Sequence, residues 1–403
     1  MKTVFKKENL FIRIAIGFGV GILLGTLAPE FSIDAKIVGD IYLNLIKVMV
    51  IPVIICAVMT GIINSSNMPS LKRVAVKTVL LYIVMFLASF VVSFVVAWII
   101  RPGMGVMFEN QPVYEGEIGG PISLSGILLG MLPHSFSDVL SAKCILPALI
   151  FALVLSAVMV SMGDKAQPVA DFINKLTKVV FRILSIIMET SPVGVMFLMA
   201  YSIAQYGTGL FMAIGRYILC CWLACIAVFI IVLFVPSVLY AKAEVKTFLA
   251  ACGKVALMTM STTSSAATLP TTIRVSVEEL GAPASISNFT LPLGCTINMC
   301  GGACSFCCLA VFVSDFYSLD LPLTQFAAMA IAATLLNMAA PGIPGGGILL
   351  MTSYLTIFSL PLDLIGPIAA FYRLLDMAFT TINVEGDVAA NLIIAKSEEN
   401  MIK

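Results

Sequence analysis

Four polar side chains near the C-terminal end of a strongly apolar chain have the types and spacing to bind a ligand. Asp376 is followed by Thr380, Asn383 and Asp387, at intervals of four, seven and eleven residues. On an α-helix these intervals place all four side chains on one narrow stripe. A carboxylate at the centre of a membrane helix costs about 2.5–3.5 kcal/mol even on lenient scales. The stripe therefore predicts a bound cation or polar ligand; pairing of the carboxylates with partner helices is the alternative.

The composition indicates a membrane protein. Of the 403 residues, 60% are hydrophobic and only 11% are charged, whereas soluble proteins carry about 25% charged residues. A formal net charge of +1 without a basic cluster gives no sign of a nucleic-acid partner. The single histidine, His134, excludes a site built from several histidines. We expect no cofactor, and we interpret the cysteines as small packing residues of apolar helices.

The hydrophobic segments that must position the stripe change character along the chain. Early segments are long, but after Lys246 they become short and are broken by Ser, Thr, Gly and Pro. Broken backbone at membrane depth is tolerated only inside protein or along a cavity. Two short interrupted segments are the usual sequence sign of a transporter binding site. We therefore predict an all-α polytopic membrane protein with eight transmembrane helices and two re-entrant helical hairpins, at 247–273 and 324–357.

The distribution of basic residues tests this topology through the positive-inside rule. With the N-terminus inside, the lysine and arginine clusters fall on the cytoplasmic side and the acidic stretch 101–122 falls outside. The rule is satisfied only if each hairpin enters and leaves on the same side. No small-residue cleavage site follows the basic N-terminus at the distance of a signal peptide. We expect a multi-pass protein of the cytoplasmic membrane, surrounded by lipid, with both termini in the cytoplasm.

Several motifs in order resemble the dicarboxylate/amino acid:cation symporter family, which includes the excitatory amino-acid transporters. Ser264-Ser-Ala-Ala-Thr-Leu-Pro270 is similar to the serine-rich tip of the first hairpin of that family. Leu291-Pro-Leu-Gly-Cys-Thr-Ile-Asn-Met299 and Asn383-Val-Glu-Gly-Asp387 are similar to its seventh and eighth helices. The resemblance runs nearly from end to end. It implies a homotrimeric secondary transporter with elevator-type movement and a small-molecule substrate.

The resemblance also implies a division of the chain into a fixed scaffold and a moving transport domain. Scaffold helices 1 and 2 are expected within 1–75, and scaffold helix 5 within 163–208. The segment 76–162 is expected to hold helix 3 of the transport domain and the broken helix 4 of the scaffold. The rest of the transport domain, 209–403, is expected to contain helix 6, hairpin 1 (247–273), helix 7 (286–313), hairpin 2 (324–357) and helix 8 (362–396).

The residues that match the family motifs imply a substrate pocket between the two hairpin tips. Half-helix N-termini carry unpaired N–H groups that suit a carboxylate. In the family, the aspartate that matches Asp376 holds the substrate amine, so its retention favours an amino acid. The implied substrate-binding residues are Ser264, Ser265, Gly302, Ile343, Pro344, Gly345, Asp376, Phe379, Thr380 and Asn383.

Three departures from the family pattern bear on the substrate side chain. Members that take acidic amino acids have an arginine where this chain has Phe379, and a threonine where it has Gly302. Thr263 stands where some members carry another arginine. These departures favour a sodium-coupled symporter of a neutral L-amino acid. Arg373 leaves an alternative open, because it could bind an acidic amino acid or a dicarboxylate, although we expect it to pair with Asp376.

The resemblance implies sodium ions as co-substrates. One matched site comprises Gly294, Asn298, Asn383 and Asp387. A second, formed mostly by backbone carbonyls, comprises Thr296, Met299, Asn337, Met338 and Ala340. The third site of the family has lost oxygen ligands, because Cys300 replaces an aspartate and Met85 and Phe86 replace a threonine and a serine. We therefore predict two coupled sodium ions, with a proton-coupled carrier and an amino acid exchanger as alternatives.

Other functional classes fit the sequence less well. A membrane enzyme would need a nucleophile with a base, or paired acids beside a metal. The pair Asp376 and Asp387 is eleven residues apart and has no histidine nearby in the sequence, so we expect no enzymatic activity. Hairpins that close over a site favour a carrier over a channel.

Overall fold

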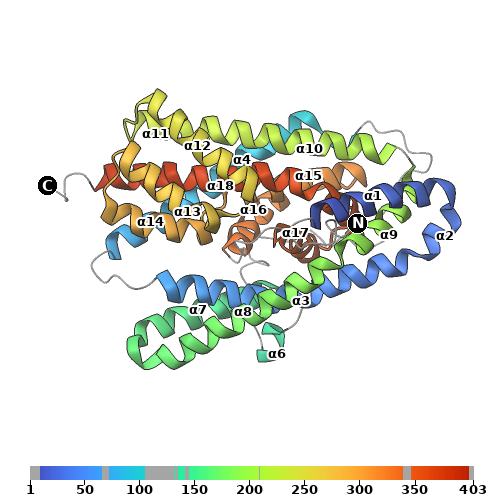
Figure 1. Ribbon diagram of the computed structural model, residues 1–403, viewed down its shortest axis with the longest axis horizontal. Coiled ribbons are helices and arrows are strands. Elements are labelled where there is room, and N and C mark those ends of the chain that lie inside the picture. Colours follow the sequence, from blue (N-terminus) through green and yellow to red (C-terminus); the bar gives the residue numbers. More distant parts are fainter. Residues whose placement is uncertain are drawn as a thin grey trace.

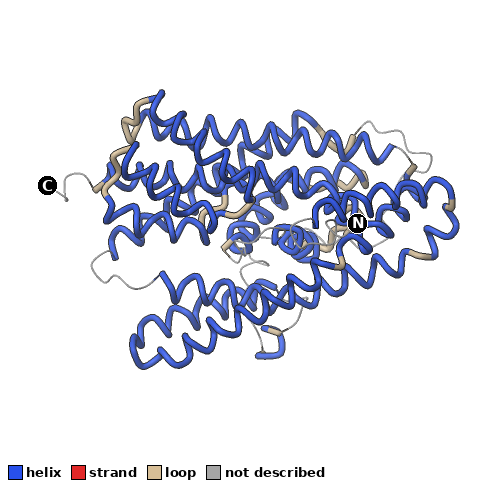
Figure 2. The backbone as a smooth tube through the Cα atoms, in the orientation of Figure 1, coloured by secondary structure: helices blue, strands red, loops and turns tan. Residues whose placement is uncertain are grey.

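The computed structural model describes residues 10–65, 72–104, 132, 135–140, 145–207, 209–338 and 346–398. Within these ranges the regular structure is entirely helical (Figures 1 and 2). The elements of the first half are α1 (Leu10–Leu27), α2 (Pro29–Asp34), α3 (Lys36–Ser65), α4 (Lys72–Ile100), α6 (Phe136–Val139), α7 (Ile145–Met162), η3 (Gly163–Ala166), α8 (Gln167–Glu189) and α9 (Ser191–Tyr206). Those of the second half are α10 (Gly209–Val228), η4 (Phe229–Phe234), α11 (Val235–Leu239), α12 (Val245–Thr262), α13 (Ser265–Arg274), η5 (Val275–Glu279), α14 (Ala284–Ile297), α15 (Cys300–Phe316), α16 (Leu323–Asn337), α17 (Gly346–Ile357) and α18 (Ile365–Ser397).

Several of these helices are long and apolar enough to cross a membrane. By length and composition, the described residues hold 5 such spans. They are Pro29–Ile63, Arg73–Ile100, Pro147–Glu189, Gly209–Leu239 and Ala284–Phe316. Three shorter apolar helices are Ile12–Leu27, Leu323–Asn337 and Gly346–Ile357. The protein is therefore a multi-pass membrane protein, and the count of eight spanning helices stays a prediction.

The helices pack in two groups that meet along the middle of the molecule (Figure 1). In one group α3 contacts α7, α8 and α9, and α1 lies along α9. In the other group α18 lies among α10, α12, α14 and α15, and α4 packs against α10 and α15. Helix α18 therefore lies within the second group, where its side chains are surrounded by protein on most sides.

The segment predicted as the first hairpin, 247–273, consists of α12 and α13. The two helices meet at Thr263, which has a left-handed backbone conformation with φ 47°. Ser264 is the N-cap of α13, and its side chain accepts a hydrogen bond from the Ala267 amide at 3.3 Å. The predicted second hairpin, 324–357, consists of α16 and α17. Its tip, with Ala340, Ile343, Pro344 and Gly345, lies outside the described residues.

The segment predicted as one helix, 286–313, is two helices. The break falls between α14 and α15, where Asn298 has an extended backbone (φ −92°, ψ 98°) and Met299 caps α15. Side chains of α18 compensate for the lost helical hydrogen bonds: Asn383 Oδ1 accepts from the Gly301 amide at 2.8 Å. Inside a membrane protein such a break survives only with partners of this kind, and a hydrophobicity pattern cannot locate them.

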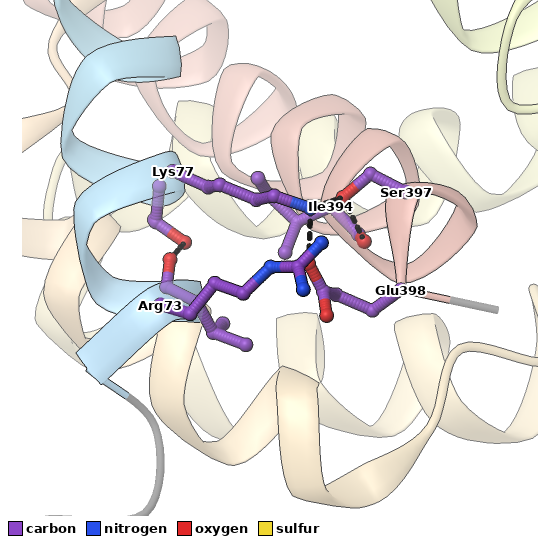
Figure 3. A network of polar contacts seen from close by, with 7 residues as sticks. Arg73, Lys77, Ile394, Ser397 and Glu398 are labelled. Atoms are coloured by element: carbon purple, nitrogen blue, oxygen red, sulfur yellow. Dashed lines mark hydrogen bonds and ion pairs between the residues drawn. The ribbon is translucent and has the colours of Figure 1, made fainter. Parts of the chain in front are cut away.

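Helix α18 is long and continuous, and it is fixed at its C-terminal end by a charged cluster (Figure 3). Glu398 pairs with Lys77 and, at 3.6 Å, with Arg73, both from the start of α4. Lys77 Nζ also donates to Ser397 Oγ at 3.4 Å. The eighth helix was predicted at 362–396. In the structure it begins three residues later, at Ile365, and ends at Ser397.

Candidate functional site

The polar stripe predicted on the last helix is buried in the structure. Asp376, Thr380, Asn383 and Asp387 are 9%, 5%, 8% and 1% exposed. Helix α18 packs against α14 and α15, and two residues of the stripe bond to the break between these helices: Asn383 accepts from the Gly301 amide and Asp387 accepts from Asn298. Buried carboxylates that face other helices are expensive unless they are paired or ligand-bound, so the surroundings of each one decide its role.

A cavity of about 570 Å³, open space at its mouth included, lies beside this stripe. Its walls come from the junction of α12 and α13, from α15, from both arms of the second helix pair and from α18. The lining residues are Thr263, Ser265, Met299, Gly302, Ser305, Phe306, Asn337, Gly347, Leu350, Tyr372, Asp376, Phe379, Thr380 and Asn383.

Most of the predicted substrate-binding residues meet at this cavity. Ser265, Gly302, Asp376, Phe379, Thr380 and Asn383 all line it. Ser264 is not among the lining residues, because its side chain is turned to the N-terminus of α13 as a cap. Ile343, Pro344 and Gly345 lie outside the described residues. Met299 and Asn337, which were assigned to a sodium site, also reach the cavity.

Sequence reasoning missed five lining residues: Ser305, Phe306, Gly347, Leu350 and Tyr372. Tyr372 precedes Asp376 by four residues, so the stripe on α18 could have been extended to it. Ser305 and Phe306 similarly follow Gly302 by one helical turn. Gly347 and Leu350 carried no signal, because only the packing of α17 brings them to the cavity.

The Asp376 carboxylate is held by hydroxyl groups. Thr380 Oγ1 donates to Asp376 Oδ1 at 3.1 Å. The Tyr372 hydroxyl lies within hydrogen-bonding reach of the same carboxylate from the preceding turn. An ionised carboxylate only accepts hydrogen bonds, so this group can bind an ammonium or another donor in the cavity.

Arg373 does not pair with Asp376, which corrects the sequence-based expectation. Its Nη1 donates to Thr263 Oγ1, and its Nη2 donates to the Ser261 carbonyl at 2.9 Å. The guanidinium therefore lies at the tip of the helix pair α12–α13, next to the cavity-lining Thr263. A helical projection could not show this, because the direction of a long side chain depends on which neighbour offers acceptors.

The first predicted cation site gathers around Asp387. Asn298 Nδ2 donates to Asp387 Oδ1 at 3.0 Å. The other carboxylate oxygen, Oδ2, is buried and has no hydrogen-bond donor among the described residues. A Cβ atom on Gly294 would lie only 2.3 Å from Oδ1, so only glycine lets the carboxylate approach α14 this closely. A buried carboxylate oxygen without a donor is a fitting ligand for a hard cation.

The residues of the second predicted cation site lie where two helices end. Thr296 is in the last turn of α14, and Asn337 and Met338 end α16. Asn337 Nδ2 donates to the Ile297 carbonyl at 3.4 Å, which ties the two helix ends together. Helix C-termini carry partial negative charge and unpaired carbonyls, so this meeting point suits a cation. Ala340 lies outside the described residues.

The residues at which the sequence predicts loss of a third cation site are buried among other side chains. Met85 and Phe86 are 3% and 2% exposed. Cys300 Sγ lies 3.4 Å from Asn298 Oδ1, and the Ser89 hydroxyl donates to the Met85 carbonyl at 2.7 Å. Thiols and thioethers are soft ligands that bind hard cations poorly. The loss of hard oxygen ligands inferred from the sequence is consistent with this packing.

Comparison with known proteins places the chain in a family. The profile described as the sodium:dicarboxylate symporter family matches residues 10–397. A C4-dicarboxylate transport protein of Pseudomonas fluorescens (strain Pf0-1) is 26% identical over 396 residues, which cover 96% of this chain and 89% of that protein. A proton/glutamate-aspartate symporter of Bacillus subtilis (strain 168) is 25% identical over 400 residues, covering 98% and 96%. With a match from the first helix to the end of α18, the chain belongs to the sodium:dicarboxylate symporter family.

Proposed function

We propose that this protein is a cation-coupled symporter of an acidic amino acid such as aspartate or glutamate. The observation that carries the proposal is the position of the Arg373 guanidinium on Thr263 and Ser261. Some relatives carry an arginine at the position of Thr263, as the resemblance implies. Arg373 brings the same charge to the same tip from α18. A guanidinium there can bind the side-chain carboxylate of the solute with two hydrogen bonds.

Asp376 favours an amino acid over a simple dicarboxylate. Its carboxylate lines the cavity and is only 9% exposed. A second acidic group close by would be repelled by it in a site of low dielectric constant, whereas an ammonium group would be attracted. The combination of Arg373 and Asp376 therefore suits a solute with both an amine and an additional carboxylate.

The names of the relatives support an acidic solute over a neutral one. One relative is named for C4-dicarboxylates and another for glutamate and aspartate. The neutral amino acid predicted from the sequence depended on Phe379, Gly302 and Thr263, and Phe379 is 3% exposed in the cavity wall. That reasoning treated Arg373 as neutralised by Asp376. Because Arg373 binds the hairpin tip instead, we prefer the acidic alternative.

We further propose that sodium is the coupled cation, at the Asp387 site and at the meeting of α14 with α16. Two ions per solute would then be transported, because the third site has Cys300, Met85 and Phe86. The ratio can be read from the reversal potential of flux in proteoliposomes. A ratio of three would contradict the loss of the third site, and uptake driven by a proton gradient without sodium would make the proton the coupled ion.

Alternating access by an elevator movement, with the expected division into scaffold and transport domain, is part of the same proposal. So are the homotrimer and the cytoplasmic location of both termini. Cross-linking in native membranes tests the oligomer, and accessibility of tags at the two ends tests the topology.

The test of the substrate is uptake by the purified full-length protein in proteoliposomes. We expect saturable uptake of radiolabelled L-aspartate under an inward sodium gradient, with competition by L-glutamate. Weaker competition is expected from succinate, which lacks the amine, and none from alanine. If alanine competes strongly and L-glutamate does not compete, the substrate is a neutral amino acid, as first predicted from the sequence.

A further inference from the structure

Tyr372 lines the cavity, and neither the motifs nor the helical stripe identified it. It is 6% exposed and lines the cavity one turn before Asp376 on α18. Its hydroxyl lies within hydrogen-bonding reach of the Asp376 carboxylate. Thr380 donates to the same carboxylate from one turn after it, at 3.1 Å. The carboxylate is therefore flanked along the helix by two hydroxyl groups.

The same tyrosine hydroxyl lies directly against the second helix pair. A Cβ atom built on Gly347, in the first turn of α17, would be 1.7 Å from the Tyr372 oxygen. No side chain fits at Gly347 unless the tyrosine moves. The hydroxyl is thus confined between the backbone of α17 and the carboxylate of α18.

This confinement has a consequence for ligand binding. The terminal torsion of an aspartate side chain is broad, so a carboxylate with few partners samples several orientations. Hydrogen bonds to a charged acceptor are stronger than neutral ones, and two donors from fixed helical positions orient the group. Binding an ammonium requires that orientation, whereas a solute without an amine makes no use of it.

We propose that Tyr372 is a positioning residue that sets the preference of the pocket for amine-bearing solutes, by orienting Asp376 and by contacting α17. This inference rests on the proposed function, because it concerns the same cavity. It adds a determinant of specificity that lies outside the matched family motifs. It also links the amine site to the second helix pair through one hydroxyl group.

The experiment compares Tyr372→Phe with the wild type, using L-aspartate and succinate as probes. The two probes differ only in the amine. We expect L-aspartate to bind about tenfold more weakly, as for the loss of one hydrogen bond to a charged group, and succinate to change less than twofold. Tyr354→Phe is the matched control, since Tyr354 is fully buried in α17 and its hydroxyl has no partner among the described residues.

A second variant tests the contact with α17. Gly347→Ala should push the tyrosine away from Asp376. It should therefore weaken the binding of L-aspartate more than the binding of succinate. In the double variant with Tyr372→Phe, the two losses should be less than multiplicative, because the same interaction is removed twice. Equal weakening of both probes, or an unchanged ratio of their affinities, would overturn the proposal and leave Tyr372 a packing residue.

Failure of the proposed function would show separately, in the wild type. If the wild type binds alanine and neither L-aspartate nor succinate, the acidic substrate is wrong. The binding of alanine and propionate to Tyr372→Phe is then measured, because these two probes again differ only in the amine. A selective loss of alanine binding would still support the role of Tyr372, and a loss shared by both would overturn it.

Discussion

Helix α18 and its C-cap residue Glu398 carry four buried carboxyl groups. Three of them, all except Glu385, lie at equal intervals, and their surroundings differ. Asp376, Asp387 and Glu398 are eleven residues apart, which brings each close to the same helix face. Asp376 faces a cavity and is flanked by hydroxyl groups. Asp387 is 1% exposed and has one amide donor and one oxygen without a donor among the described residues. Glu398 is paired with Lys77 and Arg73 at the end of the helix (Figure 3).

The comparison shows that spacing on a helix gives a carboxylate its direction but not its role. A group beside an open cavity can exchange its partner, which a carrier requires of its substrate site. A sealed group with an unused oxygen suits a dehydrated cation. A group paired with two basic side chains needs no ligand. We therefore expect substitution of these three residues to affect different properties of the protein.

The largest effect is expected from Asp387→Asn. Removing the charge from the sealed site takes away the partner of a dehydrated cation, so sodium-dependent binding of L-aspartate should be abolished. The measurement is L-aspartate binding as a function of sodium concentration. Glu398→Gln is the control, because Glu398 is the C-cap residue of the same helix, and L-aspartate binding by this variant should remain dependent on sodium. Retained sodium dependence in Asp387→Asn would place the coupled cation elsewhere.

Asp376→Asn should weaken L-aspartate binding strongly without loss of the fold. Leaving the ammonium without its charge partner at a desolvated site costs about 2–5 kcal/mol, which is tens- to thousands-fold in affinity. Succinate should bind as well as in the wild type or better, because a repulsive charge is removed. Calorimetric titration of both ligands measures this. Unchanged affinity for L-aspartate would show that Asp376 is structural.

Arg373→Ala tests the guanidinium at the hairpin tip. We expect a loss of about 1.5–3 kcal/mol for acidic solutes, the value of hydrogen bonds to charged groups, or roughly ten- to a hundredfold in affinity. Arg274→Ala is the matched control, because Arg274 ends α13 and pairs with Glu278 and Glu279 away from the cavity. If L-aspartate and L-glutamate compete as strongly in Arg373→Ala as in the wild type, the main support for an acidic substrate is removed.

The smallest effect is expected from Glu398→Gln. Its partners are partly exposed, at 32% for the Lys77 side chain and 61% for that of Arg73, so the pairing contributes about 1 kcal/mol. A slightly lower melting temperature of the purified protein should result, and L-aspartate affinity should not change. A large change in affinity would mean that the end of α18 takes part in transport.

The sequence determined the class of the protein and the part of the chain that carries the site. Composition and broken hydrophobic segments indicate a polytopic membrane protein, because lipid excludes polar groups and irregular backbone without partners. The stripe from Asp376 to Asp387 was predicted from helical periodicity alone. These inferences succeeded because they depend on local spacing and on the transfer of side chains out of water.

The tertiary structure decided what depends on contacts between distant segments. The break at Asn298, the direction of Arg373 toward Thr263, and the approach of Tyr372 to Gly347 are all of this kind. In each case the partner of a group is supplied by another helix that packing brings close. The spacing of residues along one helix does not reveal which partner that will be. The change of the proposed substrate from a neutral to an acidic amino acid follows from one such contact, that of the Arg373 guanidinium with Thr263 and Ser261.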